Sequence, residues 1–75
     1  MKTFILLLSP KHNHSRYLCE MIESMEFNEK KLIEFLNEYK VTDYHLYPIS
    51  EFMDMVNDQQ IENLDGYFFT YITLN

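Results

Sequence analysis

The chain has 75 residues, a formal net charge of −6 and a single cysteine, Cys19. This length corresponds to one domain, and one cysteine excludes an internal disulfide, which favours a reducing, cytoplasmic location. No apolar run approaches the roughly 20 residues of a membrane span. Six Lys and Arg residues against twelve Asp and Glu residues disfavour direct binding to nucleic acid, because phosphates need cations to neutralise them.

The first forty residues predict a strand followed by two helices. Residues 2–8 contain an unbroken apolar run, which is typical of a strand covered on both faces. Residues 15–25 carry apolar side chains at the i, i+3, i+4, i+7 spacing of an amphipathic helix. Asn28 is a good N-cap residue, so we expect a second helix to follow it, either separate or as the continuation of one bent helix.

The second half predicts a strand, a short helix and a last strand. Residues 41–47 are half polar, which is typical of a strand at the edge of a sheet. Pro48 ends this strand, and Ser50 is expected to cap a helix that extends to about Asp58. Residues 65–74 are aromatic and β-branched, and they form the best strand candidate in the chain.

These elements predict one small α/β domain over residues 1–75, with α+β as the alternative. We expect a three-stranded sheet with the first strand at its centre and the helices packed on one face. Because helices alternate with strands, at least one parallel pair of strands is expected as well. The residues expected in the core are Phe4, Leu6, Leu18, Ile22, Leu36, Phe52 and Ile72.

The charges divide unevenly along the chain. Residues 1–40 hold all six Lys and Arg residues and six acids, whereas residues 41–75 hold six acids and no Lys or Arg. The second half is therefore predicted to meet a protein partner with a basic surface; the alternative is that its acids only keep a small apolar domain in solution. The candidate partner-binding residues are Asp43, Glu51, Asp54, Asp58, Glu62 and Asp65, with Tyr67 and Tyr71 as aromatic anchors.

His12, His14 and Cys19 are the side chains from which a metal site or a thiol enzyme would be built. Their spacing matches no zinc or metalloprotease motif, and a lone cysteine beside the apolar face of a helix is typical of a buried, inert thiol. The segment 9–15 has no glycine, which disfavours a phosphate-binding loop. We therefore expect no enzymatic activity, no metal and no cofactor.

One pattern in the second half extends from the second predicted strand to the last. Its residues are Leu46, Ile49, Ser50, Glu51, Phe52, Val56, Asn57, Asp58, Gln59, Leu64, Asp65, Tyr67, Phe68, Tyr71 and Ile72. The pattern resembles that of small acidic αβ proteins of bacteria and their phages. In size and acidity the chain also resembles phage-encoded inhibitors of host defence, including anti-CRISPR proteins.

The resemblance implies a non-enzymatic inhibitor in the host cytoplasm that docks on a basic surface of a nucleic-acid-handling enzyme. One alternative is a homodimeric structural or regulatory module without such a partner. Another is an enzyme or metal protein that uses His12, His14 or Cys19.

Overall fold

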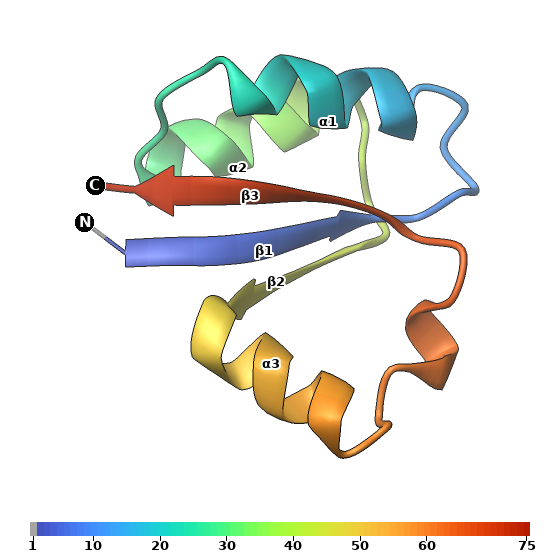
Figure 1. Cartoon of the computed structure of the whole chain (residues 1–75). Coiled ribbons are helices and arrows are strands. Elements are labelled where there is room, and N and C mark those ends of the chain that lie inside the picture. The colour runs from blue at the N-terminus through green and yellow to red at the C-terminus, as the bar shows by residue number, and fades with distance from the viewer. Residues whose placement is uncertain (1) are drawn as a thin grey trace.

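A three-stranded sheet lies between two layers of helices in the computed structural model, which describes residues 2–75 (Figure 1). The elements in chain order are β1 (Lys2–Leu8), α1 (Ser15–Glu23), α2 (Glu29–Glu38), β2 (Tyr44–Pro48), α3 (Ile49–Asn57), the 3-10 helix η1 (Glu62–Leu64) and β3 (Phe68–Leu74). The strand order is β2-β1-β3. The predicted mixed α/β class, the central first strand and the edge position of β2 are confirmed.

Both pairs of neighbouring strands are antiparallel, so the expectation of a parallel pair was wrong. The reason is that two helices connect β1 to β2. The chain runs back along α1 and forward again along α2, so it enters β2 in the direction opposite to β1 (Figure 1). β2 and β3 do run parallel to each other, joined through the single helix α3, but β1 lies between them.

The expectation that all helices pack on one face also needs correction, because α3 lies on the face opposite to α1 and α2 (Figure 1). β1 explains this arrangement. Leu6 and Leu8 point into the core beneath α1 and α2, whereas Ile5 and Leu7 point to the α3 side. All four side chains are between 0% and 4% exposed. A strand that is apolar on both faces needs cover on both.

The larger core fills the space between the sheet and the helices α1 and α2. Its buried residues are Leu6, Leu8, Leu18, Cys19, Ile22, Phe27, Leu32, Phe35, Leu36, Val41 and Ile72. α1 and α2 are separate helices, and the side chain of Asn28 caps α2 by accepting a hydrogen bond from the main-chain N–H of Lys31 at 2.8 Å. Of the predicted core residues, Phe4 and Phe52 are only partly buried, and the other five are buried.

The smaller core lies on the α3 side of the sheet. Ile5, Leu7 and Leu64 are buried there. The partly buried residues around them are Tyr47, Phe52, Met55, Ile61 and Tyr67. No residue of α3 is itself buried. The α3 face of the sheet is therefore covered far less completely than the other face.

Leu6→Ala and Ile22→Ala are each expected to lower the free energy of unfolding by about 2–5 kcal/mol, because each opens a cavity in the larger core. Ile33→Ala on α2 is the matched control, since Ile33 is 44% exposed and its truncation leaves no cavity. Thermal melting followed by circular dichroism measures the difference. Melting curves that are the same for all three variants would contradict the packing of β1 against α1.

Candidate functional site

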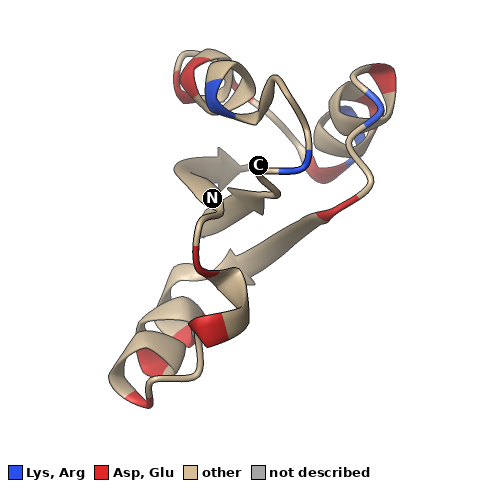
Figure 2. Ribbon diagram, turned by 90° about the vertical axis from the view of Figure 1, so that its right-hand side faces the viewer, with Lys and Arg blue, Asp and Glu red and all other residues tan. Residues whose placement is uncertain are grey.

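The segment from residue 49 to residue 65, which we call the acidic lobe, joins α3, η1 and their connections below the sheet (Figure 1). It carries five exposed carboxylates and no Lys or Arg. These carboxylates belong to Glu51, Asp54, Asp58, Glu62 and Asp65. Figure 2 shows acids alone on this lobe, whereas the Lys and Arg residues lie on the rest of the fold. Folding therefore preserves the charge separation that the sequence contains.

The acids of α3 and its exposed apolar residues lie on different flanks of the helix. Residues three and four apart are neighbours on a helix surface, so Glu51, Asp54 and Asp58 lie along one flank. We call these three acids the acidic stripe. The exposed residues Ile49, Met53 and Val56 follow the same spacing on the other flank. A partner can thus meet charge on one side of α3 and apolar surface on the other.

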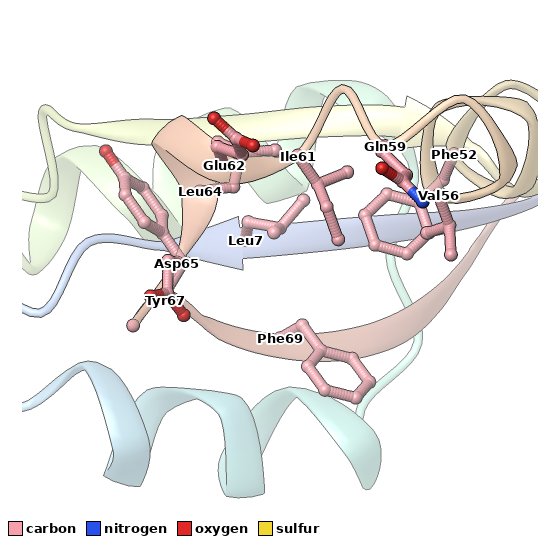
Figure 3. Close-up of a pocket in the computed structure, with 11 residues that line it drawn as sticks. Leu7, Phe52, Val56, Gln59, Ile61, Glu62, Leu64, Asp65, Tyr67 and Phe69 are labelled. Carbon is pink, nitrogen blue, oxygen red and sulfur yellow. The ribbon is translucent and has the colours of Figure 1, made fainter.

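A groove of about 520 Å³ opens between α3, η1 and β3 (Figure 3). Val56 and Phe52 enter it from α3, Leu7 from β1 and Phe69 from β3. The full lining is Leu7, Phe52, Val56, Gln59, Ile61, Glu62, Leu64, Asp65, Gly66, Tyr67 and Phe69. Two acids of the lobe, Glu62 and Asp65, therefore stand directly at an apolar groove, and the acidic stripe does not.

The groove continues onto an uncovered strip of β3. Phe69 and Tyr71 point to the α3 side of the sheet, opposite Leu7 and Ile5 of β1. They are 57% and 59% exposed, and their rings meet edge to face with centroids 6.3 Å apart. Two large aromatic side chains thus lie in solvent next to the groove. Tyr67, the residue that precedes β3, packs against the smaller core on this same side of the sheet.

Asp43 lies apart from the acidic lobe, in a polar cluster at the end of β1. Its carboxylate accepts a hydrogen bond from the hydroxyl of Tyr67 at 2.9 Å and lies 3.7 Å from the ammonium group of Lys11. The Tyr67 hydrogen bond is the main cause that lowers the pKa of Asp43, and the same bond raises the pKa of Tyr67. These two predicted contact residues bind each other, which leaves them less free for a partner than the acids of the lobe.

His12, His14 and Cys19 also make contacts within the fold. The main-chain N–H of Asp43 donates to Nε2 of His12 at 3.2 Å, and Nε2 of His14 donates to the main-chain oxygen of Tyr39 at 3.0 Å. Burial is the largest cause that raises the pKa of the Cys19 thiol, to about 11, so at neutral pH the thiol is neutral and unreactive. Within residues 2–75 no three His, Cys, Asp or Glu side chains group as metal ligands would.

The chain matches no protein-family model, no curated protein and no solved structure. Within residues 2–75, every helix is too short or too polar to cross a membrane. The fold and the site together define a small antiparallel α/β domain with an acidic, partly apolar surface.

Sequence reasoning predicted the five acids of the lobe but missed the groove beside them. Val56 and Phe69 remain 37% and 57% exposed, although apolar side chains of a helix and a strand are usually buried. The missing information was the position of α3, which packs mainly on β1 and β2 and leaves β3 open. The sequence signal for this was the aromatic side chains at alternate positions 67, 69 and 71 of the last segment.

Tyr67→Phe is expected to lower the stability of the protein at neutral pH and to raise the pKa of Asp43, because the carboxylate loses its main hydrogen-bond donor. Because folding lowers the pKa of the Asp43 carboxyl group, the group stabilises the folded state at pH values above its ordinary pKa of 3.8. This stabilisation disappears as the pH falls through the lowered pKa. The difference in stability between the two proteins should therefore vanish in strong acid. Chemical denaturation at several pH values and an NMR titration of the Asp43 carboxyl group measure both effects.

Tyr71→Phe serves as the control for this experiment, since Tyr71 lies on the same face of β3 and is largely exposed. A stability difference that stays constant from neutral pH to strong acid would show that Tyr67 acts through packing and not through the Asp43 carboxylate.

Proposed function

We propose that the chain is a non-enzymatic protein-binding module whose acidic lobe docks on a basic surface of a protein partner. The single observation that carries the proposal is that this lobe holds five exposed acids and no Lys or Arg. A one-signed surface steers an oppositely charged partner during diffusion and rejects partners of like charge. The proposed partner is a nucleic-acid-handling enzyme, because the surfaces that bind phosphates are rich in Lys and Arg.

The contacts of His12, His14 and Cys19 within the described fold support a binding role over an enzyme or metal protein that would use these three side chains. His12 and His14 each hold a main-chain group, and Cys19 is buried in the larger core. The carboxylates of the lobe are exposed to solvent, where they can meet Lys or Arg side chains of a partner. An inhibitor of the phage type, which the chain resembles in size and acidity, would use such a surface to occupy a groove built for nucleic acid.

Reversal of Asp54 and Asp58 to Lys is expected to abolish binding to a basic partner while the fold remains intact, because both side chains are exposed. The tagged chain is used to recover partners from a bacterial lysate at low ionic strength, and the affinity of each recovered protein is then measured with the wild-type chain and the variant. Binding of the wild-type chain should weaken steeply from low to physiological ionic strength, since the Debye length shortens to roughly 8 Å.

The matched control reverses Glu23 and Glu34, which are also exposed acids and lie on α1 and α2. It makes the same change in net charge on the opposite layer of the fold and should leave binding nearly unchanged. Equal affinity of the two double variants, together with insensitivity to salt, would assign the acids of the lobe to solubility alone.

A further inference from the structure

The two faces of the sheet differ by one helix. α1 and α2 together cover the upper face, whereas α3 alone lies on the lower face and packs mainly on β1 and β2 (Figure 1). A helix is about 10 Å wide and neighbouring strands lie about 4.8 Å apart, so one helix covers roughly two strands. The third strand, β3, therefore keeps an uncovered strip beside α3 that is one strand wide and adjoins the exposed apolar flank of that helix.

This strip has the chemistry of a buried helix-packing surface. Phe69 and Tyr71 of β3 are exposed on it, opposite Leu7 and Ile5 of β1. Val56 and Phe52 border it from α3 as part of the groove, which Phe69 also lines (Figure 3). The apolar flank of α3 that continues from Val56 to Ile49 is exposed in the same way. An amphipathic helix laid into such a groove anchors apolar side chains at the i, i+3, i+4 and i+7 positions.

The charges at the groove decide between a second copy of the chain and a foreign partner. Glu62 and Asp65 line the groove, and within the acidic lobe no Lys or Arg stands near them. A second copy that packed through the same strip would bring the same acids to the same place, where like charges repel. A helix with Lys or Arg along the borders of its apolar face would pair with them.

We propose that the strip between α3 and β3 is the binding site for a basic amphipathic helix of the partner. This inference rests on the proposed function and names the recognition mode. The apolar face of that helix covers Phe69 and Tyr71, and its basic border meets Glu62 and Asp65. The bound helix completes the lower layer of the fold, next to α3.

A synthetic peptide of about four helical turns tests the proposal, with Leu on one face, Lys on the other and one Trp on the Leu face. The chain contains no Trp, so the peptide fluorescence reports burial without interference. A second peptide has the same composition in an order that scatters Leu and Lys, and a third replaces Lys by Glu. The first peptide should bind with a blue-shifted emission, and the other two should bind at least about tenfold more weakly.

Phe69→Ser and Tyr71→Ser should each weaken binding of the first peptide by about tenfold or more. Tyr17→Ser on α1 is the matched control, because Tyr17 is 60% exposed but lies on the other layer, and it should bind like the wild-type chain. Circular dichroism of each variant verifies the fold. Reversal of Glu62 and Asp65 to Lys should weaken binding of the Lys peptide and strengthen binding of the Glu peptide.

Three results would overturn the proposal. The first is the absence of binding by the amphipathic Lys peptide at high micromolar concentration. The second is that the scattered peptide binds as tightly as the amphipathic Lys peptide, or that Phe69→Ser binds that peptide as tightly as the wild-type chain does. Either result would show that charge alone accounts for the contact. The proposed function would then be tested separately, by the reversal of Asp54 and Asp58. The third is sedimentation that shows a dimer of the wild-type chain dissociated by Phe69→Ser, which would identify a second copy as the occupant.

Discussion

The burial of β1 on both of its faces is the constraint on which the rest of the structure depends. Leu6 and Leu8 lie in the larger core, and Ile5 and Leu7 lie against the smaller one, all at 4% exposure or less. A strand of this kind needs a strand on each edge to pair its main-chain groups and a helix layer on each face to exclude water. The central position of β1 and the three-layer arrangement both follow from this single apolar run.

The number of helices between consecutive strands then determines how completely each face of the sheet is covered. Two helices lie between β1 and β2, and they cover the upper face of the sheet completely enough to bury Thr70 and Ile72 of β3. One helix lies between β2 and β3, and it leaves Phe69 and Tyr71 of the same strand in solvent. Neighbouring residues of one strand thus differ entirely in burial, because alternate side chains face layers of unequal width.

Local features of the sequence predicted most of the elements, and long-range features were missed. The cap at Asn28 and the helical spacing after it depend on residues a few positions apart, so they can be read from the chain. The antiparallel pairing depends on the break between α1 and α2, and helix boundaries are poorly defined by sequence. The hydrogen bond between Asp43 and Tyr67 joins residues 24 positions apart, and no periodicity in the sequence indicates it. The acids of the candidate site were predictable by composition; the groove beside them required the position of α3.

The acidic lobe buries few side chains and its charged side chains are all acidic. Both properties link the stability of the lobe to its proposed partner. No residue of α3 is buried, and Asp58 stands at the C-cap, where the helix dipole already places partial negative charge. The repulsion among these acids opposes the folded lobe, and the lobe itself contains no Lys or Arg to offset it. A basic partner that binds the folded lobe removes this repulsion and covers the apolar groove in one step, so it stabilises α3 by mass action. The same acids that weaken the free lobe would therefore strengthen the proposed complex with a basic partner.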